Sequence, residues 1–359
     1  MSPSPAMKPP GLGEPVPWFK AHCLDGRSNY AFDTVAGRHI LMLFMGAADP
    51  EARVRAITQV HAARSMFDDR TACFFGVSSD PEDVAARIAT MLPGIRYFLD
   101  HDLAVSRAYG AEADAFWLIV DPSLRALARY PIEQGGKAIA ALRAAGTMLM
   151  EDSWAPVLLV PNILEPTLCR RLVQLHQDHG GEESGFMREI DGTTVLQVDP
   201  RHKRRRDWGI EDPALCRQLR VRVQRRLLPM VERAFQFRPT RIERYIVGCY
   251  DASDGGHFRP HRDNTTAGTA HRRFAVTINL NADQYDGGDL RFPEYGSRTY
   301  RAPTGGAVVF SCSLLHEATP VTRGARYAFL PFLYDEEAAQ IRKSNNSRLG
   351  ENVARYRAE

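Results

Sequence analysis

The sequence predicts two domains: an α/β domain, followed by an α+β domain that ends in a β-sandwich or barrel. Its 359 residues are more than one hydrophobic core usually organises. Residues 39–148 alternate between strand-like and helix-like patterns, which is typical of a central sheet covered by helices. From residue 240 onward, short strand-like runs are separated by the turn sequences "DASDGG", "DGGD" and "PTGG".

The elements of the first region are expected in the order β-α-β-α-β-β-α. A buried strand is predicted for "HILMLFM", and Asp49-Pro50 opens the helix that follows it. The strand "ACFFGVSS", the helix "DPEDVAARIATML" and the short helix "AVSRAYG" come next. A hairpin in "FWLIVDPSLRALARYP" turns at Asp121-Pro122, and "GGKAIAALRAAGTM" closes the region as a helix.

The second region begins near residue 150, after the polar stretch "MEDSWAP". Helices are predicted for "PTLCRRLVQLHQDHG" and for the long amphipathic segment "PALCRQLRVRVQRRLLPMVERAF". We therefore expect a disordered Pro-rich tail at 1–11, domains at 12–150 and 151–336, and a polar, helical tail at 337–359.

The composition is that of an ordinary globular protein, with 44% apolar and 25% charged residues. A net charge of +3 is too small to indicate a nucleic-acid partner. The run "RHKRRR" at 201–206 is the local exception, and it fits either a solvated loop or a contact with an acidic partner or substrate.

Cysteine usage and apolar run lengths predict a cytoplasmic protein with no membrane partner. The longest apolar runs are too short to span a bilayer, and the N-terminal stretch lacks the apolar core of a signal peptide. The six cysteines are scattered without a CxxC pair, which suits buried thiols in a reducing compartment.

The stretch "GGHFRPHRDN" at 255–264 supplies half of a predicted metal site. Alternate side chains of a strand share one face, so His261 and Asp263 project the same way, and His316 closes a later strand. Two histidines and one carboxylate form the facial ligand set of non-haem Fe(II) oxygenases. The same ligands serve zinc hydrolysis, but that reaction needs a general base near the metal, and the sequence offers no convincing one.

Arg326 extends this pattern, because it stands ten residues beyond His316 and a short way into the next strand. A 2-oxoglutarate chelated to the metal would extend its far carboxylate into the barrel, where an arginine forms a bidentate clamp. Arg323 is the rival, but it falls in the turn "PVTRG", where solvation is expected.

Together, "CYDASDGGHFRPHRDN", "GGDLRFPEYG" and "LLHEATPVTRGARYAF" resemble the Fe(II)/2-oxoglutarate oxygenases of the prolyl 4-hydroxylase type. The resemblance covers about residues 155–335. It implies a double-stranded β-helix (jelly roll) with flanking helices, Fe(II) held by His261, Asp263 and His316, and 2-oxoglutarate and O₂ as co-substrates. Ascorbate is implied as a candidate reductant. The implied reaction hydroxylates a C–H bond of a peptide or protein, with proline as a candidate residue, or of a small molecule, with succinate and CO₂ as co-products.

Two further cofactor-binding residues follow from this resemblance. Tyr250 matches a tyrosine that lines the co-substrate pocket, although a core tyrosine fits nearly as well. Asn279 stands where the family often has a tyrosine that hydrogen-bonds the far carboxylate, and its shorter side chain puts that contact in question. His257 shares strand parity with His261 but has no aspartate two residues on, so we expect it beside the metal ligands or facing substrate.

The first region resembles the peroxiredoxin branch of the thioredoxin fold through "GEPVPWF", "FLDHDLAVSRAYG" and "FWLIVDP", over about residues 12–148. Peroxidase chemistry needs a cysteine at the start of the helix after the first core strand, and "LMLFMGAADPEARVR" has none. A retained scaffold that docks substrate or packs against the oxygenase is expected. The alternative functions are a non-catalytic iron or 2-oxoglutarate sensor and, less consistent with these residues, a thiol peroxidase with an added metal domain.

Overall fold

A computed structural model describes residues 8–86, 88–147 and 153–356 of the chain. The chain divides into two compact units, Met1–Ser153 with Pro293–Gly296, and Trp154–Phe292 with Ser297–Glu359. The ends of both predicted tails and the predicted boundary at residue 150 lie outside the described residues. Among the described helices, none combines the length and apolar character needed to cross a membrane.

The first unit is built on a seven-stranded sheet in the order β2-β1-β5-β4-β3-β6-β7. Neighbours β3, β4 and β5 are parallel, whereas β6 and β7 form the antiparallel hairpin predicted around Asp121-Pro122. The strand bounds are β1 Lys20–Cys23, β2 Tyr30–Ala31, β3 His39–Phe44, β4 Ala72–Ser78, β5 Ile95–Leu99, β6 Phe116–Val120 and β7 Ala126–Pro131.

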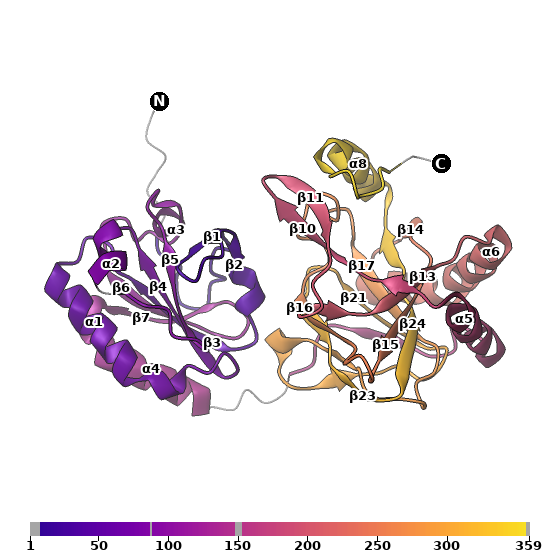
Figure 1. Cartoon of the computed structure of the whole chain (residues 1–359), viewed down its shortest axis with the longest axis horizontal. Coiled ribbons are helices and arrows are strands. Elements are labelled where there is room, and N and C mark those ends of the chain that lie inside the picture. The colour runs from indigo at the N-terminus through magenta and orange to yellow at the C-terminus, as the bar shows by residue number, and fades with distance from the viewer. Residues whose placement is uncertain (1–7, 87, 148–152, 357–359) are drawn as a thin grey trace. The chain divides into compact units, whose positions relative to one another are not determined.

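Two helices cover one face of this sheet, α1 (Pro50–Ala62) and α4 (Gly135–Thr147), and they run side by side in Figure 1. The α1 helix begins as predicted, because the Asp49 carboxylate accepts a hydrogen bond from the Ala52 N–H at 2.8 Å and Pro50 occupies the first helical turn. Apolar side chains of both helices pack against the buried strands β3, β4 and β6. The unit also contains α2 Pro81–Ala86, α3 Ala104–Ala108 and 3₁₀ turns at Phe32–Val35, Arg64–Met66 and Ile132–Gln134.

One helix prediction in this unit is wrong in its extent. The helix predicted for 80–92 ends at Ala86 in the described residues, and Met91 instead bridges Ile95 at the start of β5. The Met91 and Ile95 backbones exchange two hydrogen bonds of 3.1 Å, which a helix at Met91 could not make, and Pro93 disfavours helical backbone at Leu92. The strand β5 was not anticipated.

Among its described residues, the second unit has two main antiparallel sheets, two short two-stranded sheets and four α-helices. The larger sheet has the order β14-β25-β17-β24-β15-β13-β9, with β21 and β8 attached beside β17, and the smaller has the order β12-β16-β22-β19-β20. The strand bounds are β8 Leu158–Val160, β9 Glu182–Glu183, β10 Phe186–Ile190, β11 Thr193–Gln197, β12 Lys203–Arg204, β13 Arg206–Gly209, β14 Arg241–Glu243, β15 Ile246–Asp251, β16 His257–His261, β17 Phe274–Asn279, β18 Asp286–Gly287, β19 Leu290–Arg291, β20 Thr299–Tyr300, β21 Ala307–Ser311, β22 His316–Ala318, β23 Val321–Arg323, β24 Ala325–Phe329 and β25 Phe332–Tyr334.

The two faces of the larger sheet have different roles. Its outer face packs against α5 (Pro166–His179), α6 (Pro213–Arg222) and α7 (Leu228–Phe235) in the main core of the unit. On its inner face, Tyr250 of β15 joins Phe258 of β16 and Ala318 of β22 in a second apolar cluster. This second cluster links the two sheets. The candidate residues His261 and His316 lie on strands that form it, and Arg326 lies on β24, which pairs with β15.

The long helix predicted for 213–235 forms over its full extent, but a π-helical segment at Val223–Leu227 separates α6 from α7. Pro229 lies just beyond that segment and has no N–H to donate to the preceding turn, which accounts for the local widening. After β25 come α8 (Glu336–Ser344), capped by the Asp335 carboxylate, and a 3₁₀ turn at Asn345–Arg348.

Candidate metal and co-substrate site

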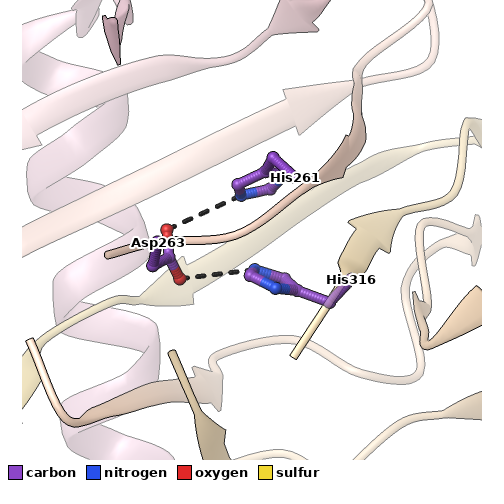
Figure 2. A group of neighbouring side chains, drawn as sticks. All are labelled: His261, Asp263 and His316. Carbon is purple, nitrogen blue, oxygen red and sulfur yellow. Dashed lines mark ion pairs between the residues drawn. The ribbon is translucent and has the colours of Figure 1, made fainter. Parts of the chain in front are cut away.

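The structure brings His261, Asp263 and His316 together between the two sheets. His261 and His316 face each other in the register of β16 and β22, and Asp263 follows two residues after His261. Asp263 Oδ1 lies 3.6 Å from His261 Nε2, and Oδ2 lies 3.3 Å from His316 Nε2. The three potential ligand atoms lie within 4.8 Å of one another, and Figure 2 shows the side chains converging from two segments. This is the spacing of a single metal ion.

A β-bulge in β16 sets the direction of His261. Phe258 pairs with Ala318 and His261 with His316, so three steps on β16 match two on β22. The extra residue turns Phe258 and His261 to the same face, and their rings stack with centroids 3.5 Å apart. The expectation that His257 shares a face with His261 is therefore wrong. Its Nδ1 lies 2.8 Å from the Gly255 carbonyl oxygen instead.

Backbone carbonyls hold both imidazoles in one tautomer. His261 Nδ1 lies 2.8 Å from the Arg259 carbonyl oxygen, and His316 Nδ1 lies 3.0 Å from the Leu314 carbonyl oxygen. Each contact keeps the hydrogen on Nδ1, so each Nε2 presents a lone pair to the centre of the group. The same arrangement orients metal-ligating histidines generally.

The protonation states suit metal binding. Burial lowers the pKa of His261 to about 4, and the neighbouring His316 adds to this effect. Burial alone would raise the pKa of Asp263, but His316 and His261 together hold it well below its usual value of 3.8. A neutral imidazole and an ionised carboxylate are the forms that act as ligands.

Arg326 lies on the inner face of β24 and is only 2% exposed. Its Nη1 donates to the Gly288 carbonyl oxygen at 2.7 Å, whereas its Nε has no hydrogen-bond partner among the described residues. Arg326 also forms no ion pair with a carboxylate in the described part of the chain. A buried guanidinium without a counter-ion is costly, so this position calls for an anionic ligand.

The chain around Gly288 is shaped to fit Arg326. Gly288 has φ +66°, and a Cβ placed there would lie 3.3 Å from Arg326 Cδ and 2.8 Å from a Val321 methyl. Tyr285, just before, is 1% exposed, and its hydroxyl lacks a hydrogen-bond partner among the described residues. Burial raises the pKa of Tyr285, and the charge of Arg326 offsets part of that rise.

Tyr250 lies directly opposite Arg326 in the pairing of β15 with β24, so the two side chains share the inner face. The Arg326 Cζ lies 5.2 Å from the centroid of the Tyr250 ring. The sequence-based choice of Tyr250 as a pocket residue is consistent with this position.

Asn279 has a less favourable orientation. It is 2% exposed, and its Nδ2 donates to the Ala302 carbonyl oxygen at 2.7 Å, which leaves Oδ1 without a partner among the described residues. An amide oxygen accepts hydrogen bonds and offers nothing to a carboxylate. In this orientation Asn279 does not donate to a co-substrate, so that role stays a prediction.

The solvated-loop interpretation of the basic run is wrong for Lys203 and Arg205. Both are buried, at 4% and 7% exposure, while Arg201, Arg204 and Arg206 are exposed. The alternation arises because the run forms β12 and the start of β13, and alternate strand residues point to opposite faces. Every residue of this run is basic, so the sequence contains no alternation that could mark which of its side chains are buried.

Most of the remaining arginines and cysteines match their sequence-based interpretations, and Arg262 is the exception. Arg323 is exposed and pairs with Asp286, its Nε 2.6 Å from Oδ2, and Arg259 is also exposed. Cys249 belongs to the core on the helix-covered face of the larger sheet, and Cys312 is fully buried. Arg262 is buried rather than at a rim, with its guanidinium against the Ser313 carbonyl oxygen.

Comparisons with known proteins agree on the C-terminal region. Residues 245–334 match the sequence profile of the 2OG-Fe(II) oxygenase superfamily. A PKHD-type hydroxylase of Cupriavidus metallidurans is 39% identical over 95 residues, covering 24% of this chain and 42% of the relative. A PKHD-type hydroxylase of a Synechococcus strain is 32% identical over 117 residues, covering 30% of this chain and 51% of the relative.

The chain spans about half the length of the curated relatives that it matches. Among solved structures, a Pseudomonas putida prolyl-4-hydroxylase is 18% identical, with a TM-score of 0.36 over 50% of this chain and 93% of that one.

Proposed function

We propose that the C-terminal unit is an Fe(II)- and 2-oxoglutarate-dependent dioxygenase that hydroxylates a C–H bond of its substrate. The observation that carries this proposal is the convergence of His261, Asp263 and His316, with both Nδ1 atoms tied to carbonyls and both Nε2 atoms turned inward. Two imidazoles and one carboxylate suit Fe(II) and leave three coordination positions for other ligands. The match of residues 245–334 to the 2OG-Fe(II) oxygenase superfamily supports the same conclusion.

Iron held there, with 2-oxoglutarate and O₂ as co-substrates, would supply the oxidation, in which one oxygen atom would enter the new C–OH group and the other would enter succinate, with release of CO₂. The protein residues bind, orient and exclude water. His261, Asp263 and His316 would hold the metal, and Arg326 would bind the far carboxylate of 2-oxoglutarate, for which its missing counter-ion and free Nε make it suited. Phe258 and Phe310 pack against the two imidazoles and keep that side of the metal position dry.

The proposed prime substrate is a peptide or protein, with proline as the first residue to test. The similarity to PKHD-type hydroxylases supports a hydroxylation, and the choice of proline rests on the resemblance of the sequence to prolyl 4-hydroxylases. A small-molecule substrate is the alternative that a substrate screen would reveal. Ascorbate is proposed as the reductant that maintains Fe(II).

We also propose a fold for each of the two units, following the resemblances of the sequence. The facing antiparallel sheets of the second unit are consistent with a double-stranded β-helix. The strands β4-β3-β6-β7, with a helix after β3 and another after β7, are consistent with a thioredoxin-like fold for the first unit. All six cysteines are free thiols, which supports a cytoplasmic location.

We propose that the first unit is a non-catalytic scaffold. The turn after β3 leads into the start of α1, where a peroxidase would need its cysteine, and Ala48, Asp49 and Pro50 stand there. Arg53 fills the space beside this turn, with Nη2 2.8 Å from the Gly46 carbonyl oxygen and Nη1 2.8 Å from Asp80 Oδ2. An ion pair therefore occupies the region in which a thiolate would act.

The test is anaerobic reconstitution of the purified protein with Fe(II) and 2-oxoglutarate, followed by exposure to O₂ with a peptide library. We expect one Fe(II) per chain, succinate formation that increases with the right substrate, and a mass gain of one oxygen atom on that substrate. Stoichiometric iron and 2-oxoglutarate binding without succinate or any oxidised product would instead favour a sensor. Failure to bind iron would overturn the proposal.

A further inference from the structure

Three residues form a row across neighbouring strands on the inner face of the larger sheet. Arg206 pairs with Cys249, and Tyr250 pairs with Arg326, so Arg205 stands beside Tyr250 at the end of the β13–β15 ladder. The Arg205 Cζ lies 5.6 Å and the Arg326 Cζ 5.2 Å from the centroid of the Tyr250 ring. Tyr250 is thus flanked by two buried guanidinium groups.

The two arginines differ in their counter-ions. Arg205 is paired with Asp207 through two short hydrogen bonds, Nε to Oδ1 at 2.6 Å and Nη2 to Oδ2 at 2.7 Å. Arg326 has no carboxylate partner in the described part of the chain. The charge of Arg205 is therefore already balanced, whereas that of Arg326 is open to an incoming anion. Arg205 is not suited to be a second anion-binding group.

The hydrogen bond from Arg205 to Tyr250 has a directional consequence. Arg205 Nη1 donates to the Tyr250 hydroxyl oxygen at 3.2 Å. A guanidinium has no acceptor, so the phenolic hydrogen of Tyr250 cannot be donated back to Arg205, nor to Arg326. In the described residues the Tyr250 hydroxyl donates no hydrogen bond. Its hydrogen is free for an acceptor on the side where Arg326 lies.

Arg205 itself is held in place from several sides. Ser184 Oγ lies 3.3 Å from Arg205 Nη2 and accepts from Lys203 Nζ at 2.6 Å, while it hydrogen-bonds Asp207 Oδ2 at 2.5 Å. Gly248 leaves room for the side chain, because a Cβ there would lie 3.0 Å from Arg205 Cδ. This support makes the position of the guanidinium, and with it the Tyr250 hydroxyl, reproducible.

We propose that Arg205 is a positioning residue that directs the Tyr250 O–H to the carboxylate bound by Arg326. This inference rests on the proposed function, since that carboxylate is the far end of 2-oxoglutarate. Arg326 supplies the positive charge and Tyr250 supplies a neutral hydrogen-bond donor. Arg205 acts only through Tyr250, because it donates a hydrogen bond to the hydroxyl oxygen and so leaves the hydroxyl hydrogen for the carboxylate.

The test measures the dissociation constant of 2-oxoglutarate by calorimetry on the anaerobic Fe(II) protein. Tyr250→Phe is expected to raise this constant about 10-fold, the effect of one lost hydrogen bond to a charged group. The paired variant Arg205→Gln/Asp207→Asn removes both charges of this ion pair together, so neither Arg205 nor Asp207 leaves its partner as an unpaired buried ion. It should raise the constant to a similar extent. In the Tyr250→Phe background it should add less than about twofold, because Arg205 then has nothing to direct.

Two controls separate positioning from general damage. Arg206→Gln changes the exposed neighbour and should leave the constant unchanged. Binding of 2-oxopentanoate, which has the keto acid but lacks the far carboxylate, should be unaffected by all these substitutions. A merely structural role would weaken both ligands alike. If the paired variant does not fold, Arg205→Lys carries the test, since lysine keeps the charge beside Asp207 but is too short to reach both groups.

Two results would overturn the inference: an unchanged constant in the Arg205 variants, or an Arg205 effect that multiplies with that of Tyr250→Phe. If the wild-type protein binds iron but no 2-oxoglutarate, the proposed function itself fails. The two failures are therefore distinguishable in one series of titrations.

Discussion

At the scale of single residues, the site depends on groups whose ordinary partners are missing. Among the described residues, the Asp263 carboxylate lies against the His261 and His316 imidazoles, and Arg326 forms no ion pair with a carboxylate. Both are buried, and buried charges are normally paired or bound to metal ions. The two unmet charges have opposite sign, which fits a cation at one and an anion at the other.

Asp263→Ala should abolish iron binding, because it removes the only charged ligand of the three. Two neutral imidazoles alone hold Fe(II) weakly. Iron content per chain after anaerobic reconstitution is the measurement. Asp286→Ala is the matched control, since Asp286 is an exposed aspartate paired with Arg323. Wild-type iron content in the Asp263→Ala protein would rule out this metal site.

Arg326→Ala should leave iron binding nearly intact and raise the 2-oxoglutarate concentration needed for half-saturation by roughly 100-fold. The loss of a bidentate, charge-assisted contact in a buried pocket costs on the order of 3 kcal/mol. Arg323→Ala should change neither quantity, because its side chain is 65% exposed and already paired. An unchanged requirement in Arg326→Ala, with a raised one in Arg323→Ala, would exchange the two roles.

At the scale of elements, local backbone features orient the site. The bulge in β16 turns His261 inward, and the "DGGD" turn carries the Gly288 carbonyl to Arg326. Gly255 has φ +66°, and Gly256 lies so close to the Tyr250–Asp251 backbone that a Cβ would meet it at 2.6 Å. These glycines let the chain turn back tightly before β16.

Gly288→Ala should weaken 2-oxoglutarate binding and lower stability by about 1–3 kcal/mol, because it combines a positive φ with contacts to Val321 and Arg326. The control is Gly192→Ala, at φ +74° with no heavy atom within 4 Å of the added Cβ. Chemical denaturation and ligand titration of both variants give the comparison. Equal losses in both would mean that backbone strain alone, and not contact with Arg326, explains the effect.

Glu165 connects the start of α5 to the π-interrupted helix. Its carboxylate accepts from Arg222 Nε and Arg226 Nη2, each at 2.6 Å. The Arg222 contact and then the Arg226 contact lower the pKa of Glu165 to about 2. Because the folded-state pKa is lowered, the stabilisation is present above the ordinary value of 4.5 and is lost as pH falls toward about 2.

Glu165→Gln should therefore reduce stability near neutral pH by less than about 1 kcal/mol, since the side chain is 37% exposed and solvent screens the pairs. The difference from wild type should shrink in acid and vanish near pH ~2. Denaturant titrations at several pH values measure it. A difference that grows as pH falls would show that the carboxylate is not stabilising.

At the scale of the whole molecule, two cores serve two units of different character. The first unit has its own core between the sheet and helices α1 and α4, and the second has its own between the larger sheet and helices α5–α7. The candidate metal ligands and Arg326, which the sequence analysis identified, all lie in the second unit.

The first unit should not consume peroxide rapidly. Cys23 and Cys73 are both fully buried, and burial raises the pKa of Cys73 to about 12, so neither thiol ionises near neutral pH. The measurement is peroxide consumption by iron-free protein. Rapid consumption that disappears in Cys23→Ser or Cys73→Ser would contradict the scaffold role.

The sequence by itself singled out the three side chains that converge in the structure, the buried Arg326 and most elements of the fold. The His-x-Asp pair, His316 and Arg326 follow a fixed order along strand-like segments, and periodicity and capping residues such as Asp49 depend only on nearby residues. Helix starts and strand periodicity can be predicted from the sequence because they depend on interactions between residues that are close together in the chain.

Only the tertiary structure determined the features that depend on how strands pair with one another. A one-residue bulge in β16 places His257 and His261 on opposite faces of the strand, and no local sequence pattern predicts this bulge. Lys203 and Arg205 are buried within a run of basic residues because each has a polar partner. Lys203 donates to Ser184, which lies 19 residues earlier in the chain, and Arg205 donates to Asp207, two residues later. Hydrogen bonding also turned the Asn279 amide toward Ala302. Burial of a polar side chain depends on the partners that distant segments bring to it, and that information exists only once the sheets have formed.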